Sequence, residues 1–372
     1  MKDGVEVLID WLTFTVHGTD DPAAVIRDKL GMDPDLFQLA SSVLSGYSAE
    51  QRFSDIHVCY GGETRVNRTT GEVCFDSERM GVCVSMSGNG CRTFENLSNL
   101  KPENVQGQTE NTSLPFCSLF QTIAADENIH VTRLDVACDD KHGYLDKEEL
   151  FDCYHNDALN TRSTKWNWIE GKAGRKGRDT GFTFYVGSAS SDFRLRIYDK
   201  AAQQNLDQHW IRCEMKMKDA HADAFIKQAA VSGASVGELA AEVLNDKVAF
   251  VELDDSNISR CTVCSWWSDF VSTVKSVHLV AREAIQHPVQ KIAQWLRYQV
   301  GCSLRIVKET MGYMELRNII EEAEDRLSMK QRALIKDYNA LQYARGAGPV
   351  QIHPPLPALP VFSPLPAVSA FA

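Results

Sequence analysis

The chain lacks any long apolar run. No stretch of its 372 residues approaches the about eighteen consecutive apolar residues that a membrane helix needs. Its first residues also lack the basic and then apolar segments of a signal peptide. We therefore expect a cytoplasmic protein without a membrane partner, in which the eleven cysteines are reduced thiols.

The short motifs of familiar metal and nucleotide sites are also missing. The histidines form no HxH or HExxH pair, and no stretch has the GxxxxGK[ST] spacing of a P-loop. Cys261 and Cys264 form a C-x-x-C pair, but no second pair of ligands accompanies it. These absences argue against a histidine metal site, a zinc module and nucleotide hydrolysis.

Positive charge is scarce in the chain as a whole. With 39 Lys and Arg against 50 Asp and Glu, the net charge is -11, which argues against a general, non-specific binder of duplex DNA. Between residues 161 and 218 the balance reverses, with twelve Lys and Arg against six Asp and Glu. A polyanion would therefore bind to this segment.

Alternating apolar residues and turn signals predict a strand-rich first part of the chain. Strands are expected at 5–16, 56–60, 72–75, 82–86, 130–139, 164–169, 180–187, 193–198 and 210–217. Helices are expected at 23–30, 34–44, 113–125, 147–154, 200–206 and 220–230, with a tight turn at 87–90. This order predicts an α+β fold with a largely antiparallel sheet flanked by helices. No internal repeat is evident.

Beyond about residue 236 the pattern becomes helical, with apolar residues three and four apart at 289–300, 315–327 and 329–343. Residues 349–372 hold seven of the twelve prolines and no charged residue, which predicts a disordered tail. The expected domains are an N-terminal α+β part at 1–125, a central core at 126–235, a helical C-terminal region at 236–345 and the Pro-rich tail at 346–372.

The segment 193–200 carries the most distinctive chemistry. On an extended strand, Arg194, Arg196 and Tyr198 share one face, apolar residues share the other, and Lys200 follows. Cations beside a tyrosine favour its phenolate and bind phosphate oxygens, which fits a nucleophile that attacks a phosphodiester. A tyrosine at the end of a plain strand with solvated arginines fits the same alternation, and this segment alone favours that alternative.

Two further strands divide in the same way into an apolar and a charged face. Their charged faces carry Arg133, Asp135 and Asp139 in one strand, and Arg212, Glu214, Lys216 and Lys218 in the other. If all three strands are neighbours, Asp135, Asp139 and Glu214 approach Tyr198, and their oxygens could hold Mg²⁺ or Mn²⁺. Cross-strand ion pairs on a solvated face would leave the same pattern in the sequence.

The candidate DNA contacts are basic residues in a glycine-rich loop and on the last of these strands. They are Lys172, Arg175, Lys176, Arg178, Lys216 and Lys218. The loop at 171–178 either contacts phosphates or simply joins two strands of a hairpin, and the sequence leaves both readings open.

Four segments resemble those of the rolling-circle replication initiators of the Rep_trans type, a family that includes plasmid initiators, relaxases of conjugative elements and phage replication proteins. The segments are 9–15, 87–92, 132–139, and 195–200 followed by 211–214. Their order and spacing cover about residues 8–230, and the tyrosine and the Arg-x-Glu element are the more specific parts. Size and opening segment most resemble the RstA-type initiators of filamentous phages.

The resemblance implies an HUH-endonuclease-like catalytic core without the histidine pair, located at 126–235. Such proteins nick one strand at an origin, form a 5′-phosphotyrosine and a free 3′-OH, and later religate the displaced strand. The resemblance maps the nucleophile onto Tyr198 and the acids that bind a divalent metal onto Asp135 and Glu214, with Asp139 as a further candidate. The other expected catalytic residues are Arg194, Arg196, Arg212 and Lys200.

The implied partner is origin DNA, single-stranded or supercoiled, in a bacterial host cell. A host helicase, a polymerase and a second copy of the chain are further expected partners. Two alternatives stay open: a relaxase for conjugative transfer with the same chemistry, and a module that binds nucleic acid without cutting it.

Overall fold

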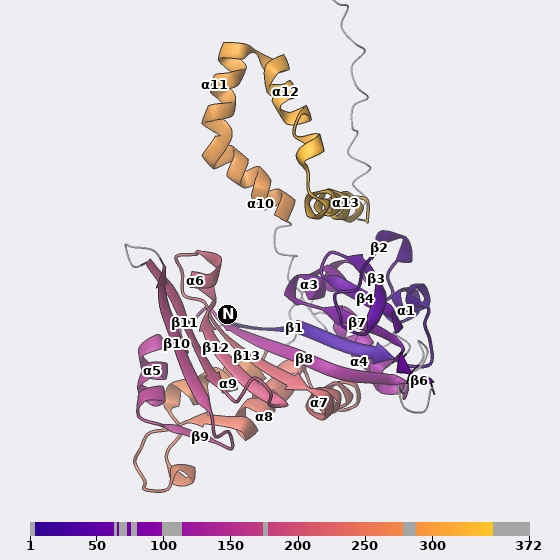
Figure 1. The fold of residues 1–372 in the computed structure, drawn as a ribbon. Helices are drawn as coiled ribbons and strands as arrows, with labels where there is room; N and C mark the ends of the chain where they lie inside the picture. The colour runs from indigo at the N-terminus through magenta and orange to yellow at the C-terminus, as the bar shows by residue number, and fades with distance from the viewer. Residues whose placement is uncertain are drawn as a thin grey trace, which may run out of the picture. The chain divides into compact units, whose positions relative to one another are not determined.

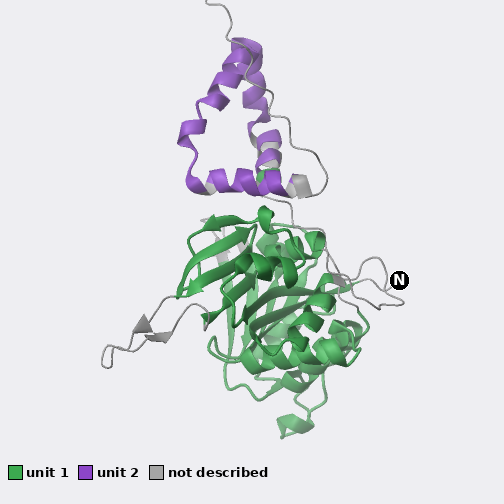
Figure 2. Ribbon diagram, turned by 90° about the vertical axis from the view of Figure 1, so that its right-hand side faces the viewer, with its two compact units in different colours: residues 1–291 green, residues 292–372 purple. Residues whose placement is uncertain are grey.

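The computed structural model describes residues 4–62, 65–66, 73–75, 80–98, 114–173, 178–277 and 288–344. The chain divides into two compact units, residues 1–291 and 292–372, which are described separately here (Figure 2). Among the described helices, none combines the length and the hydropathy that a bilayer-spanning segment requires.

A ten-stranded antiparallel sheet forms the centre of the first unit (Figure 1). Its strands lie in the order β10-β11-β12-β13-β8-β1-β7-β4-β3-β2. From β10 to β2 their bounds are Trp166–Ala173, Arg178–Val186, Phe193–Asp199, Ile211–Lys218, Ile129–Asp140, Val5–Val16, Val82–Met86, Ile56–Gly62, Tyr47–Phe53 and Gln38–Ala40. Two small pairs lie outside this sheet: β5 (Arg65–Val66) with β6 (Val73–Phe75), and β9 (Leu159–Thr161) with β14 (Val248–Phe250).

The two halves of the large sheet repeat one strand order. In each half the first strand lies at the centre, the last strand lies beside it, and the fourth, third and second strands follow toward the edge. Strands β1, β2, β3, β4 and β7 form one half, and β8, β10, β11, β12 and β13 form the other. The central strands β1 and β8 pair along their whole length, from Val5 opposite Asp140 to Val16 opposite Ile129. The repeat is one of topology, which the sequence does not reveal.

Helices bury the apolar face of the second half. In β11, Phe182 and Phe184 are buried, whereas Thr183 and Tyr185, which alternate with them, are partly exposed, as the period of a strand requires. The Phe184 ring packs against Tyr154 of α5 and against Phe250, which in turn contacts Trp267 of α9. Figure 1 shows α7, α8 and α9 gathered on one side of these strands.

The described helices of the first unit are short. They are α1 (Pro22–Asp28), α3 (Gly88–Leu97), α4 (Leu114–Ala125), α5 (Lys147–His155), α6 (Lys200–Gln204), α7 (Asp219–Val231), α8 (Val236–Lys247) and α9 (Ser265–Lys275), with the 3₁₀ turns η1 (Pro34–Leu36) and η2 (Ile258–Arg260). The capping box of Ser235 and Glu238, in which each side chain binds the other's backbone N–H, fixes the start of α8.

The second unit is helical. Helix α10 (Pro288–Trp295) leads through the π-helical turn η3 (Leu296–Val300) into α11 (Gly301–Met311), α12 (Tyr313–Glu321), the 3₁₀ turn η4 (Glu324–Arg326) and α13 (Met329–Ala344). Neither α11 nor α12 contains a buried residue, so their apolar side chains are at least partly exposed in the isolated chain.

The predicted α+β fold, with its antiparallel sheet and helical C-terminal region, is confirmed. Two local predictions are wrong. Residues 34–44 form η1 and β2 instead of a helix, because Gln38 to Ala40 pair with β3, a polar strand that alternation did not reveal. Residues 87–90 start α3 instead of closing a turn.

The two compact units divide the chain at other positions than the four predicted domains do. Helices α8 and α9, expected in the C-terminal region, belong to the first compact unit, and the four-part division stays a prediction. The Pro-rich segment 346–372 lies outside the described residues.

Phe184→Ala should destabilise the first unit by about 3–5 kcal/mol, because it removes a fully buried ring that joins β11 to α5 and β14. Urea unfolding followed by circular dichroism measures the loss. Ile169→Ala on the neighbouring strand is the matched control, since Ile169 is 52% exposed and should cost less than about 0.5 kcal/mol. Equal losses in the two variants would contradict this account of the core.

Candidate active site

Strand register brings the predicted residues together. Tyr198 on β12 lies opposite Arg212 on β13, and Arg212 lies opposite Asp139 on β8. The next two rows hold Arg196 with Glu214, and Arg194 with Lys216 and Asp135. Residues that face each other across paired strands lie on the same side of a sheet, so all of these side chains share one face. We call it the polar face.

Tyr198 is a buried phenol, only 3% exposed. Its Oη donates to Glu214 Oε2 at 3.4 Å and accepts from Lys200 Nζ at 3.4 Å, and the Arg196 guanidinium lies 3.9 Å from the ring centroid. Burial raises the pKa of Tyr198 above its ordinary value; Arg212 opposes this shift and Glu214 adds to it. The resting residue is therefore a neutral phenol, which needs additional positive charge nearby to ionise.

Arg212 ties three strands together beneath the tyrosine. Its Nε and Nη2 donate to the two carboxylate oxygens of Asp139 on β8, at 2.5 and 2.9 Å. Its Nη1 donates to Asp10 Oδ1 on β1 at 2.7 Å. The planar fork of a guanidinium suits such bidentate binding. Asp139, expected as a metal ligand, thus lies in a fully buried ion pair with Arg212.

Three carboxylates of the site, Asp10, Asp135 and Glu214, repel one another. Asp135 is 1% exposed and binds Arg133, whose guanidinium stacks 4.0 Å from the Trp11 ring. Burial raises the pKa of Asp135, and Arg133 opposes the shift. Burial, followed by repulsion from Asp10 and Asp135, raises the pKa of Glu214 to about 7. Negative charge is therefore incompletely compensated where these three acids approach one another.

The donor chemistry of these acids suits a hard divalent cation, which prefers carboxylate oxygens. Within the described ranges, however, no three Asp, Glu, His or Cys groups converge closely enough to bind one ion without rearranging. Asp135 accepts a hydrogen bond from Arg133, and Glu214 accepts one from Tyr198.

Asp10 is the site residue that the sequence prediction missed. A bulge between Ile9 and Trp11 interrupts the pairing of β1 with β8 and lets Asp10 reach Arg212. Helix α3 begins beside it: a Cβ added to Gly88 would lie 3.1 Å from Asp10 Oδ1. The available signal is a lone carboxylate inside the apolar run Ile9-Asp10-Trp11-Leu12.

The predicted DNA contacts are only partly described. Lys216 lies on the polar face between Arg194 and Asp135, and Lys218 Nζ donates to the Ala189 carbonyl at 3.1 Å. Lys172 and Arg178 belong to β10 and β11, but their side chains, like the whole of 174–177 with Arg175 and Lys176, lie outside the described residues. These DNA contacts stay predictions.

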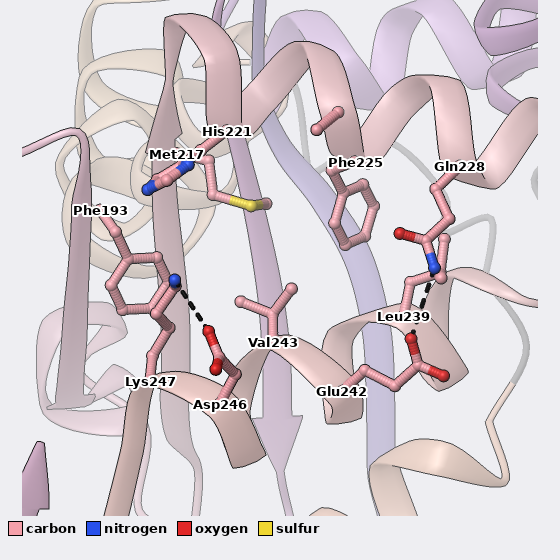
Figure 3. A pocket seen from close by; sticks show the side chains of 11 residues that line it. Phe193, Met217, His221, Phe225, Gln228, Leu239, Glu242, Val243, Asp246 and Lys247 are labelled. Atoms are coloured by element: carbon pink, nitrogen blue, oxygen red, sulfur yellow. Dashed lines mark hydrogen bonds and ion pairs between the residues drawn. The ribbon is translucent and has the colours of Figure 1, made fainter.

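A separate cavity of about 360 Å³ lies between α7 and α8 (Figure 3). It includes Phe193, which points away from the polar face because it alternates with Arg194. Its rim carboxylates already have partners, Glu242 with Gln228 and Asp246 with Lys247. This cavity therefore contributes nothing to the chemistry around Tyr198.

The comparisons with known proteins agree with this geometry. The profile described as replication initiation factor matches residues 129–328, more than half of the chain, and covers β8, β12 and β13. The chain belongs to the replication initiation factor family. A second profile, for the N-terminal domain of rolling-circle replication initiation proteins, matches residues 6–105, which include Asp10.

Two relatives of this family member support the assignment. The putative DNA relaxase NicK of Bacillus subtilis (strain 168) is 25% identical over 348 residues, which are 90% of each chain. The structure of a rolling circle replication initiator protein from Geobacillus stearothermophilus matches with a TM-score of 0.62 and 25% identity, over 76% of this chain and 100% of that one. The predicted rolling-circle initiator family is confirmed, and the finer resemblance to RstA-type phage initiators stays a prediction.

Arg212→Met should destabilise this initiator-family protein by about 3–5 kcal/mol, because it leaves the buried Asp139 charge unpaired. Urea unfolding measures the change. Arg27→Met is the control, since it removes an exposed ion pair with Asp28 that is worth at most about 1 kcal/mol. If both variants unfold at the same urea concentration, the ion pairs of Arg212 with Asp139 and Asp10 do not hold the three strands together.

Proposed function

We propose that the protein is a rolling-circle initiator that nicks one DNA strand at an origin through Tyr198 and later religates the displaced strand. The observation that supports the proposal most strongly is the set of charged side chains around Tyr198, in a chain of the replication initiation factor family. The phenol is buried with Glu214 as its hydrogen-bond acceptor, and Arg196 and Lys200 contact it. Such fixed charges are suited to a phosphodiester whose negative charge grows in the transition state.

In the nicking step, Tyr198 Oη bonds to phosphorus and the bond from phosphorus to the 3′ oxygen breaks. The 5′ phosphate stays on the tyrosine, and the other strand end keeps a free 3′-OH. The phenol proton passes to Glu214 Oε2, which already accepts its hydrogen bond. Lys200, whose pKa burial lowers, is the nearest donor of a proton to the departing 3′ oxygen. Religation runs the same steps in reverse.

The arginines of the polar face divide into two roles in this proposal. Arg194 and Arg196 are stacked on tyrosine rings and are not bound bidentately to any described carboxylate, so we assign them to phosphate oxygens. Arg212 is already bound to two aspartates, so we assign it to positioning. Asp139 gives both of its carboxylate oxygens to Arg212, whereas Asp10 gives only Oδ1, so we assign Asp139 to positioning Arg212 and keep Asp10 as a metal ligand.

After a rearrangement of their side chains, Asp10, Asp135 and Glu214 would hold the divalent cation, Mg²⁺ or Mn²⁺. Their mutual repulsion on the polar face supports this choice, because a bound cation relieves it. When bound, the ion would stabilise negative charge on the phosphoryl oxygens and on the phenolate. Because burial raises the pKa of Tyr198, the added positive charge of the ion would help the phenol to ionise.

A relaxase for conjugative transfer is the second candidate, favoured by the relative named putative DNA relaxase NicK. The same tyrosine chemistry would serve it, and the substrate would be a transfer origin. A module that binds nucleic acid without cutting it is the remaining alternative, and it forms no covalent adduct.

Tyr198→Phe should abolish nicking and the covalent adduct while DNA binding persists, because only the nucleophilic oxygen is removed. The measurement is an SDS-resistant protein–DNA band after incubation with a single-stranded origin oligonucleotide and Mn²⁺. Tyr185→Phe is the matched control, since Tyr185 lies on the same face of the adjacent strand and should keep a normal adduct. An undiminished adduct with Tyr198→Phe, or none with the unmodified protein, would contradict the proposal.

Asp10→Asn and Asp135→Asn should each weaken Mn²⁺ binding about tenfold or more, because each removes an anionic oxygen ligand. Electron paramagnetic resonance of free Mn²⁺ during titration measures the affinity. Glu170→Gln on the exposed end of β10 is the control and should leave the affinity unchanged. EDTA should in parallel abolish the adduct and spare DNA binding. Unchanged Mn²⁺ affinity in both Asn variants would remove these aspartates from the metal site.

A further inference from the structure

The polar face continues beyond the catalytic residues into a second pocket. Its volume is about 420 Å³, and it is lined by the start of β10 and by the turn between β11 and β12. Arg194 forms one wall and lies four residues before Tyr198 on the same strand, about 13 Å away along it. Asn167 lies opposite Tyr185, which lies opposite Arg196, so this amide shares the face of the catalytic residues.

The pocket carries positive charge and no acid. Lys165 and Arg194 both line it, and neither Asp nor Glu is among its lining residues. The Arg194 guanidinium is held 3.8 Å from the centroid of the Tyr185 ring, and its Nε has no hydrogen-bond partner in the described structure. A guanidinium fixed on an aromatic ring in this way is prearranged for an anion.

Space and neutral polar groups complete the pocket. Gly187 lies between the two cations, with φ of +100°, and a Cβ there would meet the Phe193 carbonyl oxygen at 2.9 Å. Since that conformation favours glycine, no side chain projects from this position. Asn167 and Ser188 supply an exposed amide and a hydroxyl, which can bind the edge of a base.

We propose that this pocket binds one nucleotide of the single strand that passes over Tyr198. Lys165 and Arg194 bind its phosphate, and the Asn167 amide binds its base. The inference rests on the proposed function in one respect: the same strand must reach the tyrosine. It adds a subsite in which base identity beside the nick is read, and it makes Asn167 a specificity-determining residue.

Binding to fluorescein-labelled (dT)₁₂ in EDTA tests the pocket without any cleavage, in the Tyr198→Phe background. Lys165→Ala should weaken binding several-fold and lower the slope of log K against log salt by about 0.7, the contribution of one phosphate contact on a single strand. Lys227→Ala on α7 is the control, since Lys227 is an exposed lysine (58%) outside the pocket and should change neither quantity. If Lys165→Ala behaves like Lys227→Ala, the pocket binds no phosphate and the proposal fails.

Base recognition is tested with the same variants and an abasic 12-mer. Asn167→Ala should weaken (dT)₁₂ about tenfold, and leave the abasic strand unaffected, because only the amide contact to the base is lost. An equal loss on both strands would mean a structural role and would overturn the assignment. These readouts need no covalent adduct, so a failed nicking assay and a failed subsite are distinguished from each other.

Discussion

The site depends on one buried interaction, the binding of Arg212 to Asp139 and Asp10. This guanidinium joins β13, β8 and β1, and it lies directly opposite Tyr198 on β12. Its single positive charge pairs with two of the four carboxylates near the tyrosine. A buried pair of this kind contributes little net stability compared with apolar packing, but loss of one partner is costly. We therefore regard it as a device that fixes strand register around the nucleophile.

The two halves of the sheet share one strand order but carry different residue types beside the centre. Both halves supply a strand beside the centre, but β7 is buried along its whole length, whereas β13 carries Arg212, Glu214 and Lys216. The first half contributes through its central strand, whose bulge turns Asp10 toward Arg212. Separate family profiles match the two halves: one covers residues 6–105, which include β2, β3, β4 and β7, and the other covers residues 129–328, which include β8 and β10 to β13.

The sequence predicted the second half of the sheet well, because apolar residues alternate with mainly polar or charged ones in β12, in β13 and in much of β8. This alternation correctly placed Tyr198, Asp135 and Glu214 on one face. Asp10 escaped prediction because a bulge, which no alternation reveals, sets its direction. The ion pair of Asp139 with Arg212 escaped because carboxylates that bind metal and carboxylates that bind arginine look alike in a sequence. Strand β3 escaped because its polar residues hide its period.

The chain is acidic overall, with a net charge of -11, but several of its cations lie together on the polar face. Arg196 lies in the row of the polar face next to that of Tyr198, and Arg194 and Lys216 share the row after it. The most direct test of the whole account is mass spectrometry of the covalent adduct after nuclease and protease digestion. We expect a nucleotide 5′-phosphate on Tyr198, in the peptide that contains residues 197–199. An adduct on any other residue, or none in the presence of Mn²⁺ and origin strand, would contradict it.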